Sequence, residues 1–317
     1  MGTRQGIYLL AGLAGALLVA ASAIAALHSW RRSEGSEPTG PGEHAKRTAS
    51  AWVMASGAVA ALLAGRMAII AVAGLVSCVA LFEFLGQCGI RWREHRCLVS
   101  ACFAFAVTQY GLVAGDRTGL FLAFVPLAAF LALPALAVLL GDTKDILRTY
   151  GRAQWGLMIP VYGMSHLPAI FLLHLGGSNE AGVLLVGYVV VVAQISDTMQ
   201  YAFGKAFGRT LMSPAISPKK TVEGLAGGGL TAILAGSALW SATPFDLPQA
   251  AALSTAIVAS GILGGLVLSA IKRDLGIKDW GRLIPGHGGV LDRADSICFA
   301  APVFFHLARW ISASAAG

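Results

Sequence analysis

Long apolar runs separated by short polar stretches dominate the chain. A helix needs about 20 apolar residues to cross a bilayer. Runs of this kind occupy 7–27, 51–86, 98–114, 119–140, 155–175, 182–195, 224–240, 250–268 and 297–311. The run 51–86 is long enough for one long helix or for a tight pair divided at Arg66. The pattern predicts an all-α fold, a polytopic membrane helix bundle with about nine or ten transmembrane helices.

Composition supports a membrane protein. The chain is 56% hydrophobic and 12% charged, with a mean hydropathy of +0.71, whereas a soluble domain carries about 25% charged residues. These values exclude a soluble enzyme with a single anchor. The 39 glycines fit close helix packing in lipid or an Ala/Gly-rich genome, and both explanations stay open. The five cysteines form no C-x-x-C pair, so no disulfide or metal framework is expected.

Basic residues gather in alternate loops. Lys and Arg lie in the loops 88–97, 141–154, 201–223 and 269–295, whereas the intervening loops hold only Arg117. Cytoplasmic loops of membrane proteins carry an excess of Lys and Arg, so the four basic loops are expected to share the cytoplasmic face. The net charge of +7 is then explained by loop bias and membrane lipids with anionic headgroups, and no nucleic acid partner is expected.

The loop after 195 carries candidate chemistry. Asp197 ends an apolar run, where a carboxylate is costly and functional by default, although an Asp facing water at a helix end would look the same. Two hydroxyls and two cations follow in a turn that begins near a proline, at Ser217, Lys219, Lys220 and Thr221. Glu223 then opens a Gly-rich helix, whose free N–H groups favour anions. A basic loop that touches lipid headgroups is the simpler alternative.

The loop 269–295 is denser in charge. Its first part, with Lys272, Arg273, Lys278 and Asp279, is typical of a solvated amphipathic helix. A tight turn follows, in which proline and glycines surround His287 and let the backbone approach a ligand closely. Asp292 and Asp295 stand three apart at the start of the last apolar run. On a helix they share one face, so both could reach one divalent cation.

These residues also resemble a known family. The run S-x-I-K-R-x4-K-D-x-G-x2-I-P-x-H-G-G-V-x-D-R-A-D is similar to the signature of phosphatidate cytidylyltransferases (CDP-diacylglycerol synthases), and the upstream S-P-K-K-T-V-E-G resembles their second conserved loop. The resemblance covers the chain from Asp197 onward. It implies that CTP and phosphatidate react to give CDP-diacylglycerol and pyrophosphate, with Mg²⁺ as the cofactor.

The resemblance has three departures, which indicate a divergent paralogue branch. Gly265 stands where the family usually has an Asp that looks like a metal ligand. Ala294 stands where a larger residue is usual. The family's Asp-Thr-Gly-Ala-Tyr is Asp197-Thr198-Met199-Gln200-Tyr201 here.

The resemblance implies roles for single residues, and so does the chemistry, because CTP and phosphatidate are both anions and repel each other. Asp292 is expected to hold Mg²⁺ with Asp295 beside it, and Asp197 and Glu223 are further metal or bracing groups. Lys272, Arg273 and Arg293 are expected to be catalytic and to bind phosphates, and Asp279 is also expected to be a catalytic residue. His287 is expected to contact a phosphate or fix the turn rather than act as a general base. The remaining substrate-binding residues are expected to be Ser217, Lys219, Lys220, Thr221, Lys278, Gly288 and Gly289.

The predicted organisation has four parts. Residues 1–30 form a retained transmembrane helix, because the apolar run is too long for a signal peptide. Residues 31–50 form a polar linker, residues 51–195 the membrane helices of the N-terminal half, and residues 196–317 a catalytic membrane domain with motif loops 197–229 and 269–295. The expected location is a bacterial inner membrane with the active site on the cytoplasmic face, and a homodimer is left open.

Other functions remain as alternatives. A related enzyme could use another lipid phosphate, and a degenerate paralogue could have lost activity. A small-anion transporter needs polar sites at the midplane on interrupted helices. Its candidates are His166 with Pro168, and Gln194, which are expected to be contacts between helices or kinks.

Overall fold

The membrane bundle expected from the apolar runs is confirmed. The computed structural model describes residue 12 and residues 41–90, 95–141, 145–175 and 178–316. Within these residues, seven stretches are long and apolar enough to cross a membrane, namely Arg66–Gln87, Arg96–Ala114, Thr118–Leu139, Ile146–Leu173, Asn179–Phe207, Leu247–Asp274 and Leu291–Ser314. Thr48–Ala64 is a shorter apolar helix. The run 7–27 and the proposed helix at 1–30 fall almost wholly outside the described residues.

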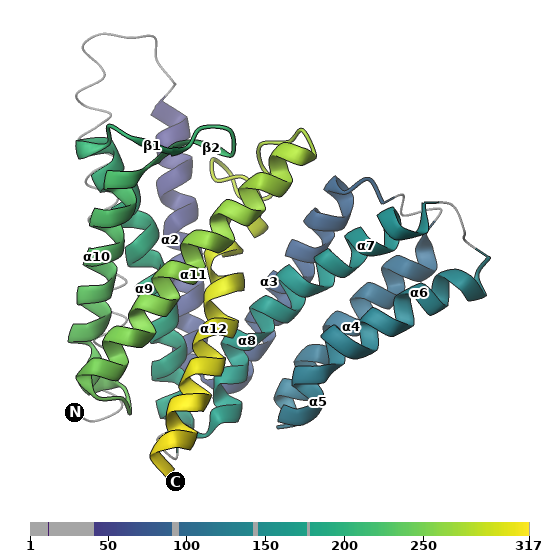
Figure 1. Ribbon diagram of the computed structural model, residues 1–317, viewed down its shortest axis with the longest axis horizontal. Coiled ribbons are helices and arrows are strands. Elements are labelled where there is room, and N and C mark those ends of the chain that lie inside the picture. Colours follow the sequence, from purple (N-terminus) through teal and green to yellow (C-terminus); the bar gives the residue numbers. More distant parts are fainter. Residues whose placement is uncertain (1–11, 13–40, 91–94, 142–144, 176–177, 317) are drawn as a thin grey trace.

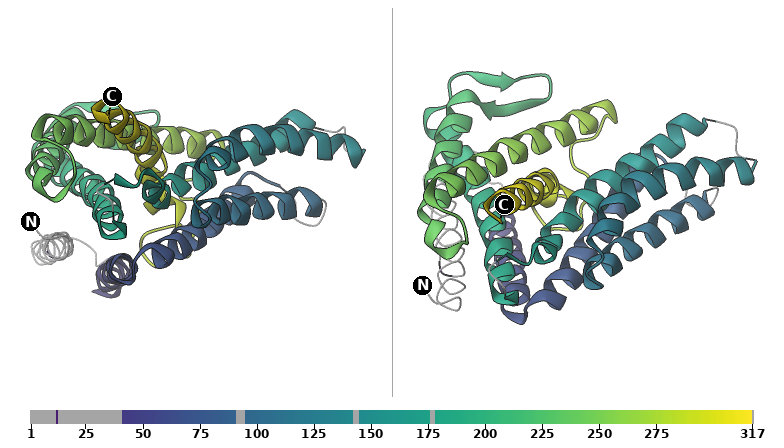
Figure 2. Two further views of the ribbon diagram at one scale, coloured as in Figure 1. Left: turned by 90° about the horizontal axis from the view of Figure 1, so that it is seen from below. Right: turned by 60° about the horizontal axis from the view of Figure 1, so that its bottom comes forward.

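The helices form two groups that meet at the centre (Figures 1 and 2). One group contains α3 (Arg66–Gln87), α4 (Arg96–Ala114), α5 (Thr118–Ala123), η1 (Phe124–Ala129), α6 (Phe130–Leu139), α7 (Ile146–Gly156), η2 (Leu157–Gly163), α8 (Met164–Ala169) and η3 (Ile170–Leu173). The other contains α9 (Asn179–Phe207), α10 (Val222–Ala238), η5 (Trp240–Ala242), α11 (Leu247–Asp274) and α12 (Leu291–Ala316). Helix α12 contacts η2, α8 and α3, and so joins the two groups.

The long run 51–86 is a pair of helices. Helix α2 (Pro41–Ala64) ends before Gly65, whose φ of 89° favours glycine. Helix α3 begins at Arg66, whose guanidinium donates to the carbonyl of Val113 at 3.0 Å and pairs with the carboxylate of Asp116. The alternative of a division at Arg66 is therefore confirmed.

Glycines let α9 and α10 approach closely. A Cβ at Gly228 would lie 2.2 Å from the backbone nitrogen of Gln200, and one at Gly224 would lie 2.7 Å from the carbonyl oxygen of the same residue. Real Cβ atoms do not tolerate such distances, so neither position accepts a side chain without moving the helices apart. Close packing of small residues in lipid thus accounts for these glycines.

Four local expectations differ from the structure. Helix α2 already begins at Pro41, inside the expected linker 31–50. Helix α9 continues past Asp197 to Phe207. The Ser217–Thr221 segment is strand β2, paired antiparallel with β1 (Leu211–Ser213), because main-chain bonding replaces the expected turn. Lys272 and Arg273 lie in the last turn of α11, which ends at Asp274, and the described residues 275–290 form no further helix, because Gly276 adopts a φ of 68° that turns the chain.

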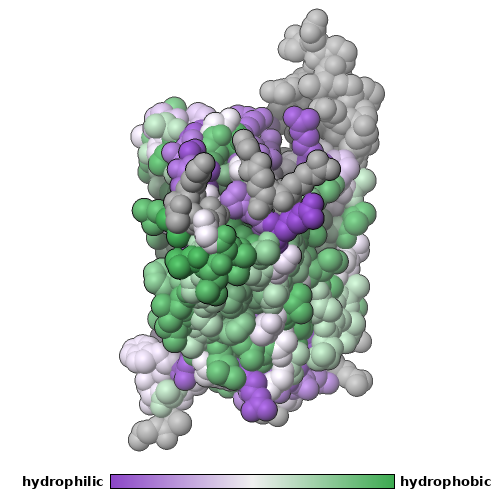
Figure 3. Space-filling model, turned by 90° about the vertical axis from the view of Figure 1, so that its right-hand side faces the viewer, coloured by the Kyte–Doolittle hydropathy of each residue, from purple (hydrophilic) through white to green (hydrophobic). Residues whose placement is uncertain are grey.

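The surface matches a protein that crosses a membrane. Figure 3 shows a hydrophobic band between hydrophilic ends. The described parts of the four basic loops lie at one end of the bundle, the upper end in Figure 1, which also carries the β1–β2 hairpin.

Candidate active site

Two carboxylates from different helices meet at one serine. The hydroxyl of Ser296 in α12 donates to Asp197 Oδ2 of α9 at 2.6 Å and lies 3.3 Å from Asp295 Oδ1. The backbone N–H of Ser296 donates to Asp295 Oδ1 at 2.8 Å. No bond to Asp197 Oδ1 or Asp295 Oδ2 is found among the described residues. The first motif loop and the signature run therefore meet at this pair, and two carboxylate oxygens keep their lone pairs.

Lys220 reaches the same place from the hairpin. A Cβ at Gly265 of α11 would lie 3.0 Å from Lys220 Nζ and 3.7 Å from Asp295 Oδ2. The ammonium and the carboxylate therefore both border the space that the missing side chain at 265 leaves. Lys220 and Arg293 are the cations whose charge acts on Asp197, and the same two act on Asp295 together with Lys272.

Asp292 has a different set of partners. Its Oδ1 accepts a hydrogen bond from Lys272 Nζ at 2.7 Å, and its Oδ2 accepts from the N–H groups of Trp280 at 2.8 Å and Gly289 at 3.0 Å. Asp292 is 9% exposed. Both oxygens are thus engaged, Oδ2 by the loop 276–290 and Oδ1 by Lys272, and among the described residues Asp292 and Asp295 share no hydrogen-bond partner. The metal role of Asp292 stays a prediction, and Asp295 with Asp197 is the more open pair.

Glu83 in α3 is a site residue that the sequence reasoning missed. Its side chain accepts hydrogen bonds from the N–H groups of Val290 at 3.0 Å and Leu291 at 2.9 Å, at the start of α12. Glu83 is 5% exposed, and any Cβ at Gly281 or Gly289 would collide with its carboxylate. A lone carboxylate inside an apolar run was the available signal, because such groups are costly in a membrane and mark functional regions.

The loop that Glu83 and Asp292 hold is tightly folded. Ile284 and Gly288 form an isolated bridge, with the N–H of His287 donating to the carbonyl of Ile284 at 3.0 Å. Gly286 and Gly288 have φ values of 75° and 85°, which explains the glycines around His287. A Cβ at Gly288 would lie 3.0 Å from Asp292 Oδ2 and 3.4 Å from Asp279 Cβ. Gly288, Gly289 and Asp279 are thus brought together around Asp292, and His287 precedes Gly288 in the same turn.

An aromatic pair anchors this loop on α3. Trp280 is fully buried and stacks on Phe84 with ring centroids 5.0 Å apart. Its carbonyl accepts a hydrogen bond from Gln87 Nε2 at 3.0 Å. The loop is therefore anchored on α3 by both apolar and polar contacts.

Several predicted residues form structural contacts at the hairpin. Glu223 accepts hydrogen bonds from the N–H groups of Arg209 at 3.0 Å and Thr210 at 3.1 Å. These bonds hold the pKa of the Glu223 carboxyl well below its usual range. Thr221 caps α10 by accepting from the N–H of Gly224 at 3.2 Å. Glu223 and Thr221 therefore shape the hairpin, and the metal role of Glu223 stays a prediction.

The other predicted residues differ in exposure. Arg273 is exposed and donates to the carbonyls of Ile216 and Ile277, both at 3.3 Å. Lys219, Lys278 and Arg293 are exposed, and Ser217 is half-buried in β2. The exposed cations have side chains that can bind phosphates, whereas Arg273 already ties the hairpin to the end of α11.

The residues fit a divalent ion at the pair of Asp197 and Asp295. Within the described ranges no group of three or more His, Cys, Asp or Glu could hold a metal. Mg²⁺, however, is usually bound through one or two carboxylates, with waters and substrate phosphates completing its shell. Two carboxylates with open oxygens beside one hydroxyl meet that need.

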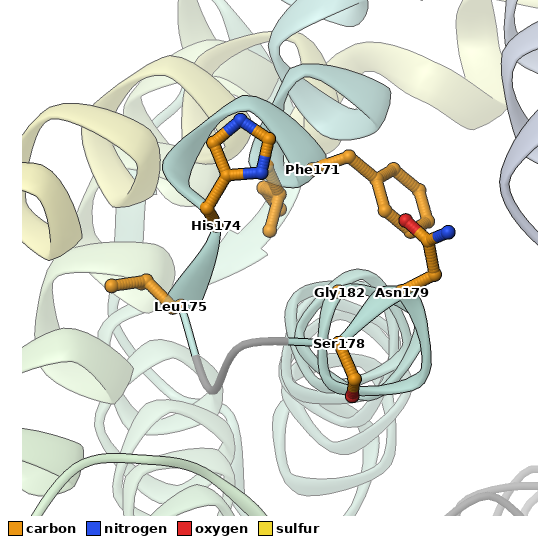
Figure 4. A pocket seen from close by; sticks show the side chains of 7 residues that line it. Phe171, His174, Leu175, Ser178, Asn179 and Gly182 are labelled. Carbon is orange, nitrogen blue, oxygen red and sulfur yellow. The ribbon is translucent and has the colours of Figure 1, made fainter.

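Other polar features lie away from these loops. Figure 4 shows a cavity of about 210 Å³ lined by Ile170, Phe171, His174, Leu175, Ser178, Asn179 and Gly182. It lies at the beginning of α9, whereas the hairpin follows that helix's other end.

His166 is fully buried, with Nδ1 2.7 Å from the carbonyl oxygen of Tyr162 and ring contacts to Phe121 and Phe305. Such packing supports its interpretation as a contact between helices.

Comparison with known proteins identifies the class of protein that these loops define. The profile of the Cytidylyltransferase family matches residues 45–311. That match covers most of the chain, which therefore belongs to the Cytidylyltransferase family, a family of nucleotidyltransferases. The resemblance seen in the signature run is thus confirmed.

Individual relatives refine the comparison. The chain is 43% identical over 204 residues to the uncharacterized protein YnbB of Escherichia coli K12, covering 64% of this chain and 68% of that protein. It is 32% identical over 205 residues to the phosphatidate cytidylyltransferase of Aquifex aeolicus, covering 64% and 77%. With the phosphatidate cytidylyltransferase of Staphylococcus aureus COL it shares 38% over 128 residues, covering 40% and 49%. The higher identity to YnbB is consistent with a divergent branch.

Proposed function

We propose that the chain transfers CMP from CTP to phosphatidate and releases pyrophosphate. A phosphate oxygen of phosphatidate bonds to the α-phosphorus of CTP, the bond from that phosphorus to the bridging oxygen breaks, and the electron pair leaves with pyrophosphate. The product is CDP-diacylglycerol. The observation that supports this proposal best is the meeting of Asp197 and Asp295 at Ser296, with Lys220 bordering the space at Gly265 next to Asp295, because it joins both motif loops in one polar place.

Positioning and charge neutralisation account for most of the chemistry. The phosphate of phosphatidate is already a nucleophile at neutral pH, so no strong base is required. The two anionic substrates repel each other, and cations that hold both must offset that repulsion. Lys219 and Arg293 are exposed at this end of the bundle, and Lys220 lies beside the carboxylates. These three side chains bind phosphate oxygens and bring the reacting atoms together.

Asp197 and Asp295 would hold Mg²⁺, the cofactor in this proposal. The ion supplies charge stabilisation to phosphate oxygens when it is bound. Asp292 and Glu83 hold the loop 276–290 against α3 and α12, which keeps the Gly-rich turn around His287 close to the carboxylates. Lys272 acts on this loop through Asp292.

The proposed location follows from the basic loops. Excess Lys and Arg mark cytoplasmic loops, and CTP is a cytoplasmic nucleotide. We therefore place the motif loops on the cytoplasmic face of the bacterial inner membrane. The acyl chains of phosphatidate stay in the bilayer and enter between helices.

A direct assay tests the proposal. Purified protein in detergent is incubated with labelled CTP, phosphatidate and Mg²⁺, and lipid-linked CMP is measured beside an active positive control. Wild-type protein should form the product, and omission of Mg²⁺ should abolish it. Parallel reactions with other lipid phosphates identify the substrate. Absence of product from every lipid would reject the enzyme proposal in favour of a degenerate paralogue.

Variants separate the roles of the acidic residues. Asp295→Asn and Asp292→Asn should each lower turnover by about 100-fold or more, the scale of losing a charge-stabilising group. Asp246→Asn is the matched control, because Asp246 caps the far end of α11 and Asn caps a helix equally well. An active Asp292→Asn variant would contradict an essential role of Asp292 at the active site. An active Asp295→Asn variant would contradict the role of Asp197 and Asp295 as the pair that holds Mg²⁺.

A further inference from the structure

Lys220 lies near the carboxylate pair, although among the described residues no hydrogen bond or ion pair joins its ammonium to either carboxylate. Asp197 and Asp295 lie within reach of one hydroxyl, that of Ser296, and their like charges repel each other. Two cations, Lys220 and Arg293, act on both carboxylates. Arg293 is exposed, whereas Lys220 is half-buried. A half-buried ammonium is screened less by water than an exposed guanidinium. Lys220 therefore offsets more of the negative charge of Asp197 and Asp295 than Arg293 does.

The hairpin aims Lys220 at this place. Strand β2 pairs with β1, with Thr221 opposite Leu211 and Ser217 opposite Ser213 and an irregularity in the register between them. Lys219 is exposed, whereas Lys220 is half-buried. The two adjacent lysines therefore have different surroundings, and Lys219 provides a matched comparison.

Gly265 leaves the space that the ammonium borders. A Cβ at this position would stand 3.0 Å from Lys220 Nζ, closer than an ordinary van der Waals contact, and 3.7 Å from Asp295 Oδ2. A side chain at 265 would displace the ammonium or bond to it. The backbone φ of Gly265 lies outside the left-handed region, since it is absent from the positive-φ glycines. Backbone conformation therefore does not require a glycine at 265, and a small shift of the flexible Lys220 side chain would admit another side chain there.

From this arrangement we propose that Lys220 is a built-in cation of the carboxylate pair and that the site takes a single divalent ion. The ammonium neutralises one of the two carboxylate charges, so the pair attracts one Mg²⁺ or Mn²⁺ and lacks the charge to hold a second. This inference rests on the proposed function, because it specifies how many metal ions the same site uses. Removing the ammonium of Lys220, or adding a carboxylate at position 265, should raise the affinity of the site for divalent ions or the number of ions that it binds.

Binding of Mn²⁺ to the purified full-length protein tests the inference without any measurement of turnover. Free Mn²⁺ is followed by its electron paramagnetic resonance signal while the ion is titrated to millimolar concentration. The wild type should bind one ion. Lys220→Met should bind it about tenfold more tightly or better, because a nearby positive charge is lost. Lys219→Met should change the affinity much less, since its side chain is solvated.

A second pair of variants does not depend on the folding of Lys220→Met. Gly265→Asp should bind Mn²⁺ more tightly than the wild type, because the new carboxylate engages the ammonium. Gly265→Asn has the same size without the charge and should not. Combining Gly265→Asp with Lys220→Met should give two bound ions.

The outcomes separate this inference from the proposed function. Two ions in the wild type, or equal affinities for Lys220→Met and Lys219→Met, would overturn the built-in cation. Equal affinities for Gly265→Asp and Gly265→Asn would do the same. In each of these cases the CTP assay, if positive, leaves the proposed transferase function standing. No Mn²⁺ binding together with no lipid-linked CMP would remove both.

Discussion

Replacement of Glu83 by Gln tests how the N-terminal helices support the signature loop. The carboxylate accepts two backbone N–H groups, those of Val290 at 3.0 Å and Leu291 at 2.9 Å. Gln offers one carbonyl oxygen and one NH₂ group, so it leaves one buried N–H facing a donor. An unsatisfied buried group costs about 1–3 kcal/mol. Losing a negative charge at a partly buried helix N-terminus adds up to about 2 kcal/mol.

The expected loss of unfolding free energy is therefore about 1–5 kcal/mol. It is measured by unfolding the protein in mixed detergent micelles, followed by tryptophan fluorescence, because Trp280 stacks on Phe84 beside this carboxylate. Glu180→Gln is the control. Glu180 also lies in the first turn of a helix, α9, but it is exposed, so its replacement should change stability by less than about 0.5 kcal/mol. Equal stability of the two variants would refute the argument.

Two further predictions concern helix packing and acid stability. Gly228→Ala should destabilise the protein by about 1–3 kcal/mol, since its Cβ would lie 2.2 Å from Gln200 N, whereas Gly111→Ala, with nothing within 4 Å, should be neutral or stabilising; equal melting shifts would contradict this reasoning. The hydrogen bond from Arg66 lowers the pKa of Asp116, so the pair stabilises the fold above the unfolded pKa of about 3.9 and loses that effect as pH falls through the lower folded value. Asp116→Asn should cost less than about 1 kcal/mol at neutral pH and nothing in strong acid, and a difference that grows toward acid would reject the assignment.

The helices could be predicted from the sequence because each apolar run is long enough to leave no other structure in lipid. The meeting of the two motif loops was also foreseeable, since both follow spans with the same orientation. Glu83 could not be paired with its loop in advance, because nothing local to it shows which backbone groups it will bind. The direction of Lys220 likewise depends on the register of a short hairpin and on the space at Gly265, neither of which hydrophobic periodicity reveals.

The bonds of Glu83 also constrain how the protein is made. Val290 stands 207 residues after Glu83 in the chain, so α3 is synthesised long before its partner. Until α12 emerges from the ribosome, the Glu83 side chain lies in an apolar helix without the N–H groups of Val290 and Leu291. An unsatisfied polar group in hydrocarbon costs several kcal/mol. A chain truncated before the signature loop would expose this defect permanently. The same carboxylate therefore fastens the loop in the finished protein and destabilises α3 in an incomplete chain.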